Sequence, residues 1–160
     1  MGRPVWVSLR SEILASVGAS AIKARPVDLI ALQANLSKSY PAIPESVTRI
    51  RHELVDYARA AGISGEALEG VQLSVSEAVT NVVRHAYRDG PGEIHVTAAV
   101  LPDELWILIA DDGCGFNTPP ADPGMGMGLA LITQASSAFS LAERAEGGTE
   151  ATMRFPLSGS

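Results

Sequence analysis

The run Leu-Trp-Ile-Leu-Ile-Ala at residues 105–110 constrains the fold of this chain more than any other segment. A strand with one solvent-exposed face alternates apolar and polar residues. An uninterrupted apolar run of this length, bounded by turn residues, instead predicts a strand at the centre of a sheet. The run passes directly into Asp111-Asp112-Gly113. Carboxylates and a glycine therefore follow at the end of the predicted central strand.

The rest of the sheet and its helices are predicted from apolar periodicity and turn residues. Strand character extends over residues 34–42, 94–101, 139–144 and 149–156. Helical spacing extends over residues 44–61, 64–86 and 127–137. Pro44 opens the first helix and Ser64 caps the second. This order predicts an α+β fold, a two-layer sandwich in which a mixed, mainly antiparallel sheet carries helices on one face.

Composition limits the class of protein. With 160 residues, of which 46% are hydrophobic, the chain suits one domain with a real core. A net charge of −6 makes nonspecific binding to nucleic acid or to an anionic membrane a poor fit. The single cysteine, Cys114, supports neither a disulfide framework nor a zinc site, and no apolar run reaches transmembrane length. We therefore expect a cytoplasmic protein.

Two units are expected along the chain. Residues 34–158 hold all the predicted strands and helices of the domain. Residues 1–33 form an N-terminal extension for which an extra helix, a loose tail and an upstream start are all open. Arg10 and Glu12 argue against a signal peptide there, because they interrupt its most apolar part.

The second helix carries an unusual polar row beside its buried stripe. Glu77, Asn81 and His85 follow one another at intervals of four residues, so they lie along one face. A solvated helix face explains a lone Glu and Asn more often than a site does. The functional alternative is a metal and proton-transfer site, since an Asn oxygen suits Mg²⁺ and a Glu one turn away can accept a proton.

Three glycine-containing segments follow the helix. In Asp111-Asp112-Gly113-Cys114-Gly115 the glycines allow positive φ or close backbone approach, although a plain tight turn is equally consistent with them. Gly124, Gly126 and Gly128 lead straight into a helix, an arrangement that offers free N–H groups to phosphates, with a flexible linker as the alternative. Gly147-Gly148-Thr149 taken alone is a common hairpin turn.

Together, the motifs EAVTN…HAY, DDGCGF, GMGMGL and GGTEATMRF resemble the nucleotide-binding boxes of the Bergerat-fold superfamily, which includes gyrase, histidine kinases and MutL. The match runs from about Leu36 to Phe155. Within the superfamily the wording of the motifs looks most like bacterial anti-sigma-factor serine kinases. The resemblance implies a histidine-kinase-like ATP-binding domain over residues 34–158.

The resemblance also implies roles for individual residues. Asn81 would coordinate a Mg²⁺ that bridges the ATP phosphates, and Glu77 would activate the attacking hydroxyl. Asp111 would pair with the adenine amino group, and Thr149 would support that pairing. The remaining residues implied to contact the nucleotide are in the two glycine loops: Gly113, Gly115, Gly124, Gly126, Gly128 and Leu129. His85 and Tyr87 complete the helix motif without an assigned role.

The implied activity is transfer of the γ-phosphoryl group of ATP to a serine of an anti-anti-sigma partner, by a protein that also sequesters a sigma factor and that forms a dimer. Glu77 favours this branch, because sensor histidine kinases usually carry Asn at that position. One departure matters: residues 116–127 contain no Lys or Arg, whereas the family's lid often carries an arginine. A nonenzymatic, nucleotide-dependent partner-switching module is therefore the alternative.

Overall fold

The computed structural model describes residues 36–87, 90–115 and 125–157. Its five strands in that part of the chain form one sheet with the order β1-β2-β3-β5-β4, and every neighbouring pair is antiparallel. The strands are β1 (Leu36–Pro41), β2 (Glu93–Val100), β3 (Glu104–Asp111), β4 (Ala138–Glu143) and β5 (Thr149–Pro156). The expected extension at residues 1–33, the turn residues 88–89 and Gly124 lie outside the described residues.

The apolar run occupies the middle of this sheet, as predicted. Strand β3 lies between β2 and β5, and all its residues from Leu105 to Asp111 are buried. Its side chains alternate between faces, and Leu105, Ile107 and Ile109 belong to the main hydrophobic core. The strand ends at Asp111, so the first carboxylate of the loop motif is held by a central strand.

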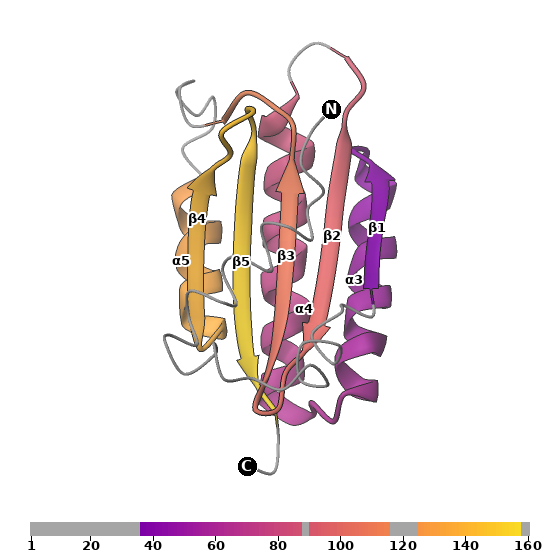
Figure 1. The fold of residues 1–160 in the computed structure, drawn as a ribbon, viewed down its shortest axis with the longest axis vertical. Helices are drawn as coiled ribbons and strands as arrows, with labels where there is room; N and C mark the ends of the chain where they lie inside the picture. The colour runs from indigo at the N-terminus through magenta and orange to yellow at the C-terminus, as the bar shows by residue number, and fades with distance from the viewer. Residues whose placement is uncertain (1–35, 88–89, 116–124, 158–160) are drawn as a thin grey trace, which may run out of the picture.

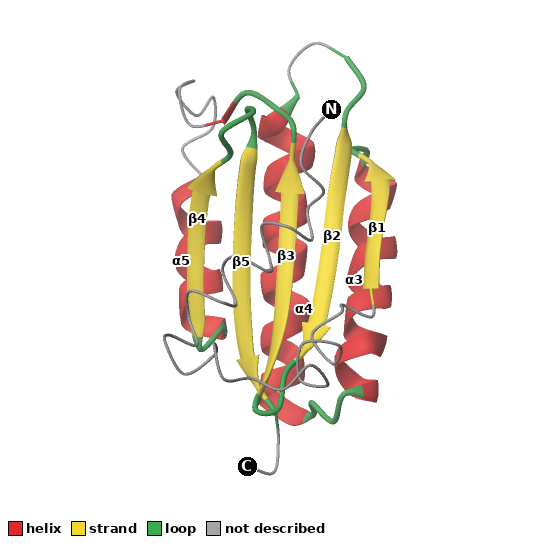
Figure 2. Ribbon diagram, viewed as in Figure 1, coloured by secondary structure: helices red, strands yellow, loops and turns green. Residues whose placement is uncertain are grey.

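Three helices pack on one face of the sheet in the described part of the chain (Figure 1), and Figure 2 shows the same two layers by element type. They are α3 (Pro44–Ala60), α4 (Gly65–Asn81) and α5 (Met125–Ala135). Pro44 stands in the first turn of α3, where a missing N–H costs nothing. The α+β sandwich with helices on one face is therefore confirmed, while the sheet, expected to be mixed and mainly antiparallel, is antiparallel at every pairing of the described strands. None of the described helices is long and apolar enough to span a membrane.

Helix α4 contributes the valine stripe at the centre of the core. Val71, Val75 and Val79 are fully buried, and Val82 nearly so, while Leu68 is only partly buried. Ser64 is the N-cap residue, as expected, but its side chain makes no capping hydrogen bond. The α-helix predicted to reach residue 86 ends at Asn81 and continues as a π-helix, η2 (Val82–Ala86). Such wider turns occur mostly at functional sites.

The contact between α4 and α5 depends on a glycine. A Cβ placed on Gly70 would lie 2.6 Å from the main-chain oxygen of Ala135 at the end of α5. Real Cβ atoms do not approach backbone oxygen so closely, and a backbone group cannot move aside as a flexible side chain can. The helix carrying Glu77 and the helix that follows the second glycine loop therefore approach each other at a residue without a side chain.

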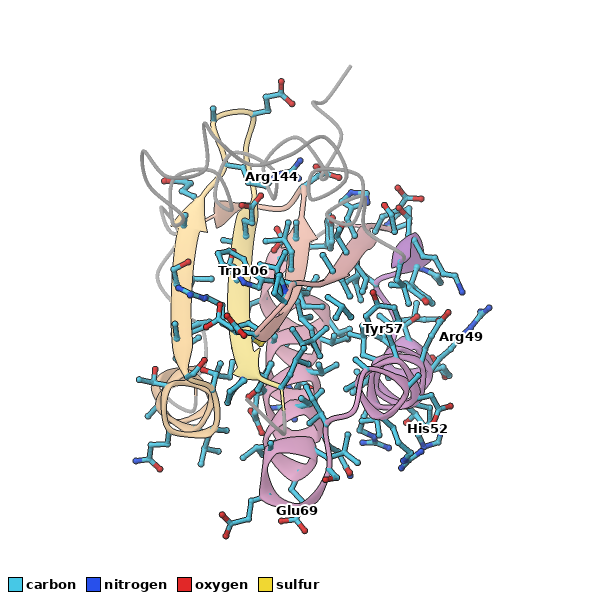
Figure 3. The ribbon with its side chains drawn as sticks, turned by 60° about the horizontal axis from the view of Figure 1, so that its bottom comes forward. Arg49, His52, Tyr57, Glu69, Trp106 and Arg144 are labelled. Atoms are coloured by element: carbon cyan, nitrogen blue, oxygen red, sulfur yellow. The ribbon has the colours of Figure 1, made fainter. Side chains whose placement is uncertain are left out.

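We expect Gly70→Ala to destabilise the protein. Overpacking costs about 1–3 kcal/mol, towards the upper end where the group met is main chain, and the better helix propensity of alanine returns at most about 1 kcal/mol, so a net loss of about 2 kcal/mol is expected. Urea unfolding measures it. Glu69→Ala is the control, because Glu69 is exposed on the outer side of α4 (Figure 3). An equal or higher midpoint for Gly70→Ala would contradict the close helix contact.

Candidate functional site

A pocket opens between the sheet and the ends of α4 and α5. Its polar lining comes from three segments that are far apart in the sequence: Asn81 and His85 at the end of α4 and in η2, Asp111 on β3, and Thr149 on β5. Strands and helices supply the apolar lining: Ala78, Val82, Ala86, Ile109, Leu129, Ile132, Leu141 and Ala151. A mostly apolar pocket with a few convergent polar groups is the usual form of a small-molecule site.

The structure brings most of the predicted site residues to this pocket. Those that line it directly are Asn81, Asp111, Gly115, Leu129 and Thr149. Glu77 and Gly128 lie at its α4–α5 side: a Cβ on Gly128 would be 2.7 Å from Glu77 Oε2 and 3.8 Å from Asn81 Nδ2. Gly126 lies in the first turn of α5, and Gly124 is outside the described residues. His85, which had no assigned role, also lines the pocket.

Asp111 is held by donors that leave its carboxylate able to accept more. It is 1% exposed, and its Oδ1 accepts hydrogen bonds from the main-chain N–H of Gly113 at 2.8 Å and of Thr149 at 3.3 Å. Its Oδ2 accepts one from Thr149 Oγ1 at 2.5 Å. A carboxylate has about four lone-pair sites, so three donors leave room for one further donor from the pocket. An exocyclic amine on an aromatic ring meets that requirement, whereas a carbonyl oxygen would be repelled by the carboxylate.

The glycines of this loop serve two different purposes. Gly115 has φ 66°, in the left-handed region that glycine tolerates without strain. Gly113 has no positive φ; instead, a Cβ there would lie 2.1 Å from the main-chain oxygen of Ala86. The neighbouring Cys114 N–H donates to that same oxygen at 2.9 Å. The loop after β3 is therefore packed directly against the end of η2, and only glycine fits at position 113.

The β4–β5 turn approaches β3 in a similar way. Gly148 has φ 90°, and a Cβ on it would lie 2.0 Å from the main-chain oxygen of Asp111. The turn therefore closes onto the end of β3 and places Thr149 against the Asp111 carboxylate. The third glycine segment, which alone indicated only a hairpin, is in this structure a wall of the pocket.

Residues that the sequence did not single out surround the Asp111 loop from outside. Asp112 turns away from the pocket and contacts His95 and Arg144. Burial raises the pKa of the Asp112 carboxyl, but hydrogen bonds and charge from His95 and Arg144 outweigh it and hold that pKa below its usual value of 3.8. The alternation of side chains along strands, once the register is known, is the feature that would have grouped them.

Tyr87 joins three elements at the same loop. Its hydroxyl donates to the main-chain oxygen of Glu93 at 2.6 Å and accepts from the Asp112 N–H at 2.9 Å. Burial is the main cause of its raised pKa. This last residue of the EAVTN…HAY motif therefore connects the end of η2 to the start of β2 and to the loop after β3. It is not among the residues that line the pocket.

The fold is a two-layer α+β sandwich with a mostly apolar pocket between its layers, and comparison with known families assigns it to a class. Residues 40–155, more than half of the chain, match the histidine kinase-like ATPase domain, and the chain belongs to that family.

Curated relatives narrow the similarity further. The chain is similar to proteins named serine-protein kinase RsbW. The one from Bacillus licheniformis is 41% identical over 87 residues, 54% of each chain. Those from Bacillus mycoides (strain KBAB4) and Listeria monocytogenes serotype 4a (strain HCC23) are 38% identical over 77 residues and 41% identical over 78 residues. These two alignments cover 48% of this chain and 48% and 50% of the relatives. The chain thus spans about half the length of the relatives it matches.

Proposed function

We propose that this chain binds ATP with Mg²⁺ and transfers the γ-phosphoryl group to a serine of a protein partner. One observation carries the proposal: Asn81 from α4, Asp111 from β3 and Thr149 from β5 line a single pocket beside α5, in a chain of the histidine kinase-like ATPase family. The relatives are named serine-protein kinases, and this supports serine as the acceptor.

The end of the pocket at Asp111, where the nucleobase would bind, suits adenine. Asp111 retains acceptor capacity for the exocyclic amine after binding Gly113 and Thr149. Apolar side chains such as Leu129 and Leu141 line the space around it and favour a flat, uncharged ring. Because Asp111 is nearly inaccessible to solvent, its hydrogen bond to a ligand competes little with water.

The phosphate end would lie at the start of α5. The first N–H groups of an α-helix have no partner within the helix and carry the positive end of its dipole, which favours phosphate. Gly126 and Gly128 stand in this first turn, and Leu129 continues it into the pocket. A net charge of −6 makes such local binding necessary, because the overall field repels an anion.

The donor set fits Mg²⁺ carried by the nucleotide. Among the described residues no group of three or more His, Cys, Asp or Glu side chains is placed to hold a metal. Mg²⁺ with ATP needs few protein ligands, because phosphates and water fill its other positions. Asn81 lines the pocket, and its amide oxygen would serve as one such ligand. The ion would neutralise charge that develops on the transferred phosphoryl group.

Glu77 would take the proton of the acceptor hydroxyl. In the proposed step the serine oxygen bonds to the γ-phosphorus, the bond to the bridging oxygen of ADP breaks, and the hydroxyl proton passes to the Glu77 carboxylate. Glu77 lies one helical turn before Asn81 and against Gly128, so it is close to both the metal ligand and the proposed phosphate loop.

The resemblance of the motifs supports a more specific setting. The phosphoacceptor would be an anti-anti-sigma protein in the cytoplasm, and the unphosphorylated antagonist would compete with a sigma factor for this chain, which would act as a homodimer. A second candidate function is supported by the absence of Lys and Arg from residues 116–127, which removes the usual lid cation for the γ-phosphate. In that case nucleotide binding alone switches partners, without transfer.

Calorimetric titration with ATP, with Mg²⁺ and with chelator, tests nucleotide binding. We expect Asn81→Ala to lose most of the Mg²⁺-dependent gain in ATP affinity, at least about tenfold for loss of one ligand to a charged group. The fold should remain, because Asn81 is only partly buried. Gln72→Ala removes an exposed amide from the same helix and is the matched control. Unchanged Mg²⁺ dependence in Asn81→Ala would remove this residue from the site.

A further inference from the structure

An outer cluster of polar side chains, an imidazole, a carboxylate and a guanidinium, lies on the face of the sheet opposite the helices. It consists of His95 on β2, Asp112 after β3 and Arg144 after β4. Alternation along the strands explains the grouping. Asp111 pairs with Ile94 and Thr149 pairs with Glu143, and each residue of the cluster directly follows one of these paired residues, on the opposite face. Figure 3 shows Arg144 near the end of the sheet, well separated from Trp106.

Arg144 connects the β4–β5 turn to the end of β3. Its Nη1 donates to the main-chain oxygen of Asp111 at 2.9 Å and to Asp112 Oδ1 at 2.5 Å. The Arg144 side chain is 13% exposed and that of Asp112 is 55% exposed, so the contact to the Asp111 main chain is the better shielded from water of the two. Its main chain closes the turn, with Arg144 N–H donating to Gly148 and Gly147 N–H donating back, both at 3.0 Å.

Asp112 is held from three sides. Oδ1 accepts from Arg144, Oδ2 is 2.5 Å from His95 Nε2, and its N–H donates to the Tyr87 hydroxyl at 2.9 Å. The peptide joining Asp111 and Asp112 is therefore fixed at both its carbonyl and its N–H. A fixed peptide fixes the direction in which the Asp111 side chain leaves the backbone.

We propose that Arg144 is a positioning residue that sets the selectivity of the pocket for adenine over guanine. The proposal rests on the proposed ATP site. Adenine presents an amine where guanine presents a carbonyl, so a carboxylate accepts from the first and repels the second. That discrimination requires a carboxylate that neither rotates nor retreats. Inside the pocket Thr149 donates to the Asp111 carboxylate, and outside it Arg144 donates to the Asp111 main-chain oxygen. Arg144 and Thr149 are five residues apart, on the two sides of the β4–β5 turn.

The chain offers a matched control arginine. Arg154 on β5 donates from Nε and Nη2 to Glu104 Oε2 at 3.0 and 2.7 Å, and it stacks over Trp106 at 4.6 Å. It is partly buried and ion-paired like Arg144, but it contacts the far end of β3, away from the pocket lining. Its loss should affect folding stability without reaching the nucleotide.

The test compares dissociation constants for Mg-ATP and Mg-GTP, together with thermal midpoints. For Arg144→Met we expect ATP affinity to fall about tenfold, as for loss of a hydrogen bond to a charged group, and the ATP-to-GTP preference to fall with it. Arg144→Lys keeps the charge without the rigid guanidinium plane and should fall between wild type and Arg144→Met. Arg154→Met should lower the thermal midpoint and leave both constants within about twofold, because it is distant from the pocket.

Each outcome decides the matter. If Arg144→Met does not fold, Arg144→Lys and His95→Leu still test the idea, since His95→Leu removes the His95 contact to Asp112, together with a surface contact to Ser39 on β1, and should narrow selectivity in the same direction. Unchanged ATP-to-GTP preference in these variants, or an equal change in Arg154→Met, overturns the proposal. A wild-type chain that binds no ATP overturns the proposed function, and this inference with it, which is a distinct result.

Discussion

Asp111→Asn is expected to weaken ATP binding by about 2–3 kcal/mol, or about 30- to 150-fold, because one buried charged acceptor becomes an amide donor. The carboxylate accepts from Gly113 N–H and from both donors of Thr149, and it is 1% exposed. An asparagine retains only one oxygen for these partners. If its NH₂ group replaces Oδ1, it faces the main-chain N–H groups of Gly113 and Thr149, which only donate. If it replaces Oδ2, the Thr149 hydroxyl can rotate to accept from it, but that position no longer accepts from the adenine amine.

The same substitution should narrow the preference for ATP over GTP, because an amide donor no longer repels the guanine carbonyl. Calorimetry with both nucleotides measures the two effects separately. Asp103→Asn is the matched control, since Asp103 is an exposed aspartate at the opposite end of β3. If Asp111→Asn keeps the wild-type affinity and selectivity, the nucleobase does not bind at Asp111, and the assignment of this end of the pocket to adenine is wrong.

Much of the fold was predictable because local and long-range requirements agree. The apolar run at residues 105–110 needs neighbours on both sides, and it is in fact the third of five strands across the sheet. The turn residues at Gly62 and the proline at position 44 bound α3 as expected. Each of these features depends on backbone preference or on burial of a whole segment, and both are visible in a single sequence.

The end of α4 was not predictable in the same way. Apolar spacing continues through Val82 and Ala86, so an α-helix to residue 86 was the simplest interpretation. The structure changes to a π-helix at Val82, where Ala86 must also accept a hydrogen bond from Cys114. Helix α5 begins at Met125, two residues earlier than expected, even though glycines disfavour a helix. Packing against other segments decides both boundaries.

Some residues of the candidate site were predictable from sequence motifs, and others depend on tertiary structure. Asn81, Asp111 and Thr149 were predicted together only through the resemblance of four motifs, since each segment alone had an ordinary structural explanation. Arg144 and His95 were not predicted, because neither belongs to a motif. Their connection to Asp112 depends on the register of four antiparallel strands. The pairing register of these strands cannot be derived from a single sequence, so the contacts of Asp112 could not be predicted.

Glu77→Gln is expected to reduce phosphoryl transfer by about 10²- to 10⁴-fold, the usual contribution of a general base, while the dissociation constant for Mg-ATP stays near that of wild type. The amide has the same shape but does not accept a proton. Single-turnover formation of phosphoserine on a partner protein, measured with γ-labelled ATP, tests this. Glu69→Gln is the matched control on the exposed side of the same helix.

Gly128→Ala gives an independent approach to the same carboxylate. Its Cβ would lie 2.7 Å from Glu77 Oε2, so the Glu77 side chain must move while its charge is retained. Transfer should therefore fall in both Glu77→Gln and Gly128→Ala. If Glu77→Gln transfers phosphate at the wild-type rate, the proton goes elsewhere. If the wild-type chain binds ATP tightly yet labels no serine, the nucleotide acts only as a switch, and the Glu77 carboxylate has no proton to accept.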